Sequence, residues 1–164
     1  MSRDQPRRPR EADQGLVATD VRDMISRGHL EQRVPDANLA QRILDEARND
    51  LAGAERLVDD FPAQALQLGY GGARKAATAI LEHQGLRVMS GEGAHAHVGD
   101  AIRAQLGSAL GRRFQGLRQI RNDTEYPKPD RDIGDERDAR AAIALANDLL
   151  TAAPQLMEQM GVFR

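Results

Sequence analysis

Four polar side chains recur at positions i, i+3, i+4 and i+7 of a predicted helix: Arg118, Arg121, Asn122 and Glu125. Residues at these spacings share one helix face. Guanidinium and amide groups donate hydrogen bonds to phosphate oxygens, and a guanidinium donates two in parallel. The spacing therefore indicates a face suited to a phosphate and, with its amide and carboxylate, to a nucleic-acid base.

Arg121 continues an apolar stripe of the same predicted helix, which runs through Leu110, Phe114 and Leu117. A guanidinium on an apolar face must find a partner or leave the core. Two interpretations stay open. In the first, Arg121 forms an ion pair with Glu125 one turn later, which contributes about 0.3–0.5 kcal/mol to stability. In the second, Arg121 points with its polar neighbours into a groove that receives an anion.

Positive and negative charges are separated along the chain. The formal net charge is −2, so the whole molecule is not a trap for polyanions. Residues 103–122 nevertheless contain five arginines and no acid, and residues 123–138 contain seven acids. Two solvated faces would produce this pattern, and so would a basic helix that docks on a phosphate backbone through Arg121, with Arg113 and Arg118 beside it.

The four histidines do not form a predicted metal site. His95 and His97 are two positions apart, which is about 200° around a helix, so one helical segment cannot direct both at one ion. The sequence has no cysteine for a disulfide, a thiolate zinc site or a nucleophile. No serine lies in a nucleophile elbow. We therefore expect neither a metal nor a cofactor.

Targeting signals are weak. The longest apolar run, AAIALA at 141–146, is far shorter than the ~20 residues of a membrane helix. The first ten residues, MSRDQPRRPR, are basic and lack the apolar stretch of a secretory signal. These features favour a cytoplasmic protein. We expect residues 1–34 to form a flexible arm with a short helix from Thr19 or Asp20, and residues 35–164 to form one domain.

Apolar residues recur at helical spacing through most of the chain, and strand patterns are nearly absent. Asp36 suits a helix cap, Pro62 a first turn and Gly85 a helix end. Helices are predicted at 36–58, 62–84, 94–106, 108–125 and 135–152, the last continuing with a kink to Met160, and 86–93 is predicted to be a loop. The predicted fold is an all-α, up-and-down antiparallel bundle of five to six helices.

Three glycines interrupt the predicted helix 62–84, at Gly69, Gly71 and Gly72. Each costs about 1 kcal/mol relative to alanine in a helix interior. They either break the helix or let a neighbouring helix approach closely, and periodicity that continues across them favours the close approach. Tyr70 lies on the apolar stripe, so we expect it in the core.

Two stretches of the sequence resemble a known family: LGYGGARKAATAILEHQGLRVMSGEGAHAHVGDAIRAQL at 68–106 and LRQIRNDTEYP at 117–127. They are similar to the HEPN (higher eukaryotes and prokaryotes nucleotide-binding) domain, above all its small bacterial members, over roughly residues 36–153. The resemblance matches Arg121 to the motif arginine and Asn122 to its polar neighbour. It matches His95 to a histidine that opens the preceding helix and implies that His95 contacts RNA.

The resemblance implies a homodimeric helical bundle whose two motif helices face each other across a cleft. It implies RNA binding, and metal-independent cleavage through attack by the RNA's own 2′-hydroxyl. Members act as toxins of toxin–antitoxin pairs or in host defence, and some associate with minimal nucleotidyltransferases. A cognate antitoxin or a nucleotidyltransferase is therefore an implied partner.

The sequence departs from the family pattern at Tyr126, where a catalytic histidine is expected. Histidine transfers protons near neutral pH, whereas tyrosine, with an ordinary pKa near ~10, is a poor base there. In one hypothesis Arg121 and Asn122 hold a phosphate that Tyr126 orients, and the basic surroundings come from Arg113 and Arg118. In the other, the chain is a non-catalytic homodimer or partner-binding module, and Arg121 pairs with an acid across the dimer.

Overall fold

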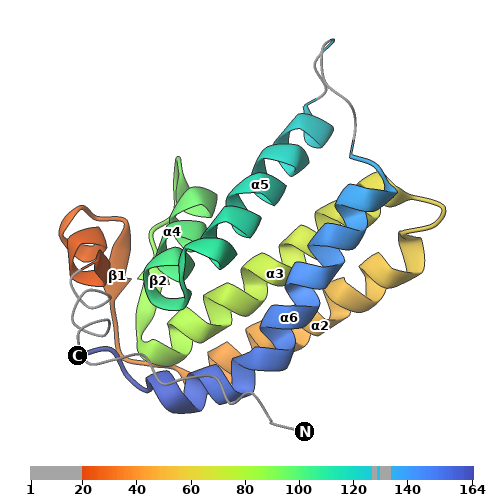
Figure 1. The fold of residues 1–164 in the computed structure, drawn as a ribbon. Helices are drawn as coiled ribbons and strands as arrows, with labels where there is room; N and C mark the ends of the chain where they lie inside the picture. The colour runs from red at the N-terminus through yellow and green to blue at the C-terminus, as the bar shows by residue number, and fades with distance from the viewer. Residues whose placement is uncertain (1–19, 127–128, 130–133) are drawn as a thin grey trace, which may run out of the picture.

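The computed structural model describes residues 20–126, 129 and 134–164. Residues 20–26 are helical. The elements that follow are β1 (Leu30–Gln32), α2 (Ala37–Leu57), α3 (Pro62–Gln84), β2 (Leu86–Val88), α4 (Ala94–Leu106), α5 (Ser108–Glu125) and α6 (Glu136–Met160). Figure 1 shows them as a helical bundle, which confirms the predicted all-α class.

Local signals set the helix ends where the sequence predicts them. The Asp36 carboxylate accepts a hydrogen bond from the Leu39 N–H at 2.9 Å and caps α2. Pro62 occupies the first turn of α3, and Gly85 ends that helix with a φ of 79°, a left-handed conformation that favours glycine. Helix α6 starts at a capping box formed by Asp135 and Asp138. It includes Pro154 and extends to Met160, as predicted.

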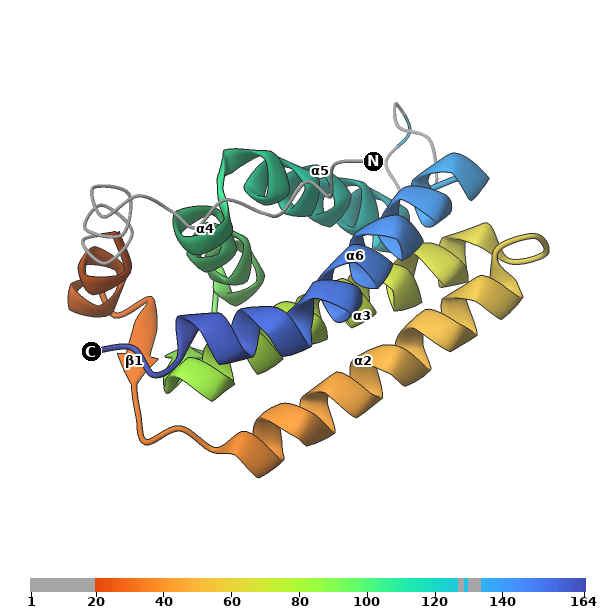
Figure 2. The ribbon, with the colours of Figure 1, turned by 60° about the horizontal axis from the view of Figure 1, so that its bottom comes forward.

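Helix α3 lies at the centre of the bundle. Figures 1 and 2 show α2 and α6 alongside it, with α4 and α5 on the side of α3 and α6 away from α2. The predicted close helix approach is confirmed. A Cβ added at Gly69 would lie 3.0 Å from the Ala142 Cβ of α6, and one at Gly72 would lie 3.1 Å from the Ala47 carbonyl oxygen of α2. The glycines therefore allow two backbones to pack against α3.

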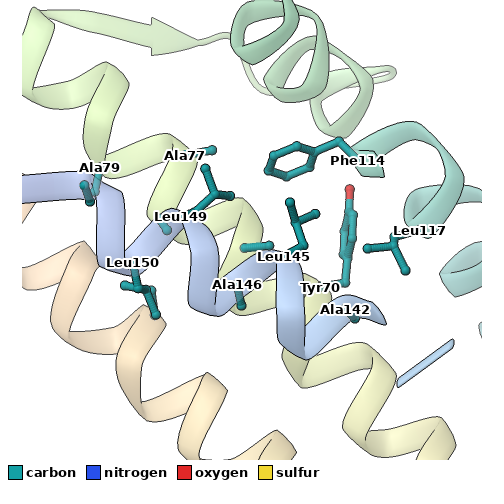
Figure 3. Packing of buried hydrophobic residues seen from close by; sticks show 14 of the residues in the cluster. Tyr70, Ala77, Ala79, Phe114, Leu117, Ala142, Leu145, Ala146, Leu149 and Leu150 are labelled. Carbon is teal, nitrogen blue, oxygen red and sulfur yellow. The ribbon is translucent and has the colours of Figure 1, made fainter. Parts of the chain in front are cut away.

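The core includes the aromatic rings that lie beside the candidate site. Tyr70 of α3 is 2 % exposed and Phe114 of α5 is 1 % exposed, which confirms Tyr70 as a core residue. Figure 3 shows the Tyr70 ring among Leu145 of α6 and Phe114 and Leu117 of α5, with its hydroxyl directed away from the α3 backbone. The apolar stripe of α5 thus packs where the sequence predicts it.

The prediction of a loop across residues 86–93 is wrong at its start. Residues Leu86–Val88 form β2, which pairs antiparallel with β1 in the register Leu30 to Val88. Each strand has three residues, which is too short for an alternating pattern to be recognised in a sequence.

The segment before α2 packs against the bundle from residue 20 onward. Val21, Met24 and Leu30 form a second buried cluster with three residues of α3, β2 and α4: Leu81, Leu86 and Ala101. Residues 1–19 of the predicted arm lie outside the described part of the chain. Among the described residues, no helix combines the length and the apolar content needed to cross a membrane.

Candidate functional site

Arg121 forms the ion pair that its spacing allows. Its Nη1 lies 2.9 Å from Oε2 of Glu125, and the side chains are 24 % and 33 % exposed. The same Nη1 donates a weak hydrogen bond to Oδ1 of Asn122 at 3.4 Å. The guanidinium at the end of the apolar stripe is therefore partly buried, and an incoming anion would compete with one carboxylate for it.

Three arginines on two helices lie close enough to Tyr70 and His95 to affect the pKa of both: Arg74 of α3, and Arg118 and Arg121 of α5. We call them the arginine cluster. Burial raises the pKa of the Tyr70 hydroxyl above 10.0, and the positive charges of the cluster oppose that rise. The three positive charges therefore all lie near enough to act on one buried hydroxyl.

His95 lies at the start of α4, and its ring stacks near that of Tyr70 with a centroid separation of 6.2 Å. Burial lowers the pKa of His95 below 6.5, and the positive charges of the arginine cluster lower it further. Glu125 opposes this shift. His95 is consequently a neutral imidazole near pH 7, so one of its ring nitrogens accepts a hydrogen bond or a proton.

Two members of the arginine cluster have no acidic partner among the described residues. In the described part of the chain, neither Arg74 nor Arg118 has a carboxylate within salt-bridge distance. Arg118 donates one hydrogen bond, from Nε to Oε1 of Gln115 at 3.3 Å. Because unpaired guanidinium groups bind phosphate and carboxylate well, these two side chains are available to an external anion.

Two residues predicted for the site, Arg113 and Tyr126, do not belong to the arginine cluster. Arg113 forms a salt bridge of 3.0 Å with Asp148 of α6, so its guanidinium already has a partner. Tyr126 follows the last residue of α5 and is 68 % exposed, and its N–H donates to the Asn122 carbonyl at 2.9 Å. The structure thus places Arg118 and Arg121 within electrostatic reach of His95, with Asn122 in contact with Arg121. Arg113 is already paired, and Tyr126 is exposed to solvent.

Arg74 is the site residue that the sequence did not single out. The sequence feature that could have identified Arg74 is its position one turn after Tyr70 on the same helix face, next to Lys75. The two cations have different surroundings. Lys75 lies 2.9 Å from Asp50 and 3.5 Å from Glu46, both on α2, and the hydrogen bond to Asp50 raises its pKa above 10.5. Only the fold shows that Arg74 joins the arginines of α5.

The histidines of α4 point to different partners. His95 stacks near Tyr70, while His97 stacks on His29 with a centroid separation of 3.9 Å. Within the described residues, no three side chains of the metal-binding types converge. The site therefore consists of cations, one imidazole, one amide and one carboxylate.

Comparisons with protein-family models, with curated proteins and with solved structures find no match for this chain. The resemblance to the HEPN domain accordingly stays a prediction. The chemistry of the site is therefore inferred from its own side chains.

Proposed function

We propose that this chain is a HEPN-like protein that binds single-stranded RNA, with the arginine cluster holding the phosphate backbone. The observation that supports this proposal is the arrangement of three guanidinium groups around His95 and Tyr70, two of them without an acidic partner. Guanidinium groups bind phosphate oxygens in pairs. All three arginines are partly exposed, so an external strand could contact them.

The neutral imidazole favours RNA among polyanions. Single-stranded RNA is recognised by stacking on aromatic or histidine rings and by contacts with the 2′-hydroxyl. His95 offers a partly exposed ring and a hydrogen-bond acceptor beside the arginine cluster. A 2′-hydroxyl next to the bound phosphate would donate to this nitrogen, whereas DNA has no such group.

The same arrangement favours cleavage of the bound strand as a second activity. In the proposed step His95 takes the proton of the 2′-hydroxyl, and the 2′-oxygen attacks the adjacent phosphorus. The P–O5′ bond breaks, leaving a 2′,3′-cyclic phosphate, and the 5′-oxygen takes a proton from water. Arg118 and Arg121 stabilise the negative charge on the phosphate during this step, and His95 returns its proton to solvent.

The biological setting proposed for this activity is that of a homodimeric toxin or defence component with a cognate antitoxin or nucleotidyltransferase. The alternative is a non-catalytic module, and the Arg121–Glu125 pair favours it, because an arginine with a permanent partner needs no ligand. In that case the helix face would serve contacts between proteins. RNA binding separates the two proposals.

The test is an incubation of a fluorescently labelled single-stranded RNA pool with the purified full chain, followed by anisotropy and by gel analysis. We expect binding, and cleavage that persists in EDTA. Arg118→Gln should weaken binding about tenfold, since a hydrogen bond to a charged group contributes about 1.5–3 kcal/mol. Arg48→Gln, which removes an exposed arginine paired with Asp45 on α2, is the matched control. No binding by the wild type would overturn the proposal, and binding without cleavage would overturn its catalytic part.

A further inference from the structure

A groove adjoins the arginine cluster. It has a volume of about 510 Å³ and is formed by residues of β1, α2, α3, β2 and α4 and of the loop after β2. Its apolar lining includes Leu39, Ile43, Val88, Met89 and Val98. The polar lining includes Glu31, Glu82, Arg74 and Arg87. A groove of this size with mixed apolar and polar walls suits a small polar ligand such as a nucleobase.

One stripe of α3 connects the cluster to the groove. Arg74, Thr78 and Glu82 are spaced by four residues and all line the groove, and positions i, i+4 and i+8 share one helix face. Arg74 and His95 belong to the groove and to the site described above. Eight residues of helix span about 12 Å, so a nucleotide whose phosphate contacts Arg74 could place its base beside Glu82.

Glu82 lines the groove and has no partner among the described residues. It is 8 % exposed, and within the described residues its carboxylate makes neither a salt bridge nor a hydrogen bond. Arg87 of β2 lines the groove as well, without a salt bridge to Glu82. Because this carboxylate lines the groove without a donor among the described residues, it is a hydrogen-bond acceptor that a ligand of the groove could use.

We propose that the groove binds a guanine base of the RNA strand, with the two Glu82 carboxylate oxygens accepting from guanine N1–H and N2–H. This inference rests on the proposed RNA binding. Guanine is the base whose Watson–Crick edge offers two adjacent N–H donors, which match a carboxylate in the bidentate manner. Adenine, cytosine and uracil each place a ring or carbonyl acceptor next to their single donor group, and that acceptor would face a carboxylate oxygen. The aliphatic side chains of the groove would cover the faces of the base.

The first test uses nucleosides, so that it does not depend on phosphate binding. Methyl signals of Ile43 and Met89 in the full-length protein are followed by NMR during titration with guanosine, inosine and adenosine. We expect guanosine to shift both signals. Inosine lacks the N2 amino group and should bind about tenfold more weakly, since one charge-assisted hydrogen bond is lost, and adenosine should leave the signals in place. Equal shifts by all three nucleosides, or none by guanosine, would overturn the inference.

The second test uses heptanucleotides of uridine with guanosine, inosine or adenosine in the middle. Glu82→Gln keeps the size of the side chain and should abolish the preference for guanosine, whereas Arg118→Gln should weaken all three oligonucleotides equally. If the wild type binds all three oligonucleotides equally, the proposed guanine site is wrong and the proposed RNA binding remains. If guanosine binds but none of the oligonucleotides does, the proposed RNA binding is wrong and the groove remains a guanine site.

Discussion

The Arg121 guanidinium lies 2.9 Å from the Glu125 carboxylate, one turn further along α5. This pair resolves how an arginine can end an apolar stripe. The Arg121 side chain is 24 % exposed, and its guanidinium lies beside an acid. A phosphate at the arginine cluster would compete with Glu125 for this guanidinium. The negative charge of Glu125 would also repel the phosphate.

Removal of that competitor should strengthen RNA binding. We expect Glu125→Gln to bind a labelled single-stranded RNA several-fold more tightly than the wild type, because Arg121 is freed and one negative charge is lost near the cluster. Asp45→Asn, which breaks the Arg48–Asp45 pair of α2, changes the net charge equally and should leave the Kd within twofold. If Asp45→Asn tightens binding as much as Glu125→Gln, overall charge is responsible and the local competition is disproved.

Loss of Arg121 should have little effect on stability. Partly exposed ion pairs contribute at most about 1 kcal/mol, so Arg121→Ala should lower the free energy of unfolding by no more than about that amount. Chemical denaturation of the two proteins measures this directly, with Arg48→Ala as the exposed control. A loss of several kcal/mol, together with unchanged RNA binding, would favour the interaction module in which Arg121 has a structural role.

Stability should depend on pH through His95. Its pKa in the folded chain lies below the ordinary 6.5 because of burial and the arginine cluster. The unfolded chain therefore binds more protons in this range, and stability falls as the pH drops below about 6.5. We expect His95→Gln to lose less stability than the wild type between pH 7.5 and pH 5.5, measured by urea denaturation. The other three histidines are the same in both proteins, so identical pH profiles would contradict the assigned shift.

Helix contacts around α3 should not tolerate a methyl group at Gly69. Its added Cβ would lie 3.0 Å from the Ala142 Cβ and 3.1 Å from the Ile143 backbone nitrogen. We expect Gly69→Ala to destabilise the protein by about 1–3 kcal/mol despite its better helix propensity. In α5, an added Cβ at Gly116 has no neighbour within 4 Å, so Gly116→Ala should be neutral or stabilising by up to about 1 kcal/mol. Equal melting temperatures for the two variants would show that α3 and α6 can separate to accept the methyl group.

The helices could be predicted from the sequence because their ends depend on nearby residues. Asp36, Pro62 and Gly85 act within one turn of their own positions, so no knowledge of the fold is needed to recognise them. The β1–β2 pair was missed because its strands are short and its partners are separated by two helices. Its pairing is determined by tertiary packing, which no local pattern records.

Helical spacing alone could predict only the part of the candidate site that lies on α5, and His95 of α4 came from the family resemblance. Arg118, Arg121 and Asn122 lie on a single face of α5, which helical spacing shows. Arg74 comes near them only through the packing of α3 and α5. Likewise, Arg113 forms its ion pair with Asp148 only once α6 has packed. Burial of Glu82 likewise requires the neighbouring elements that form the groove.

The salt dependence of RNA binding tests the arginine cluster most directly. For single strands, log K falls with log salt with a slope of about −0.7 for each phosphate contact. We expect Arg74→Gln and Arg118→Gln each to reduce this slope by about 0.7 and the double variant to reduce it by about 1.4, while Arg48→Gln on the opposite side of the bundle leaves it unchanged. Slopes that are the same for the wild type and the double variant would contradict the account.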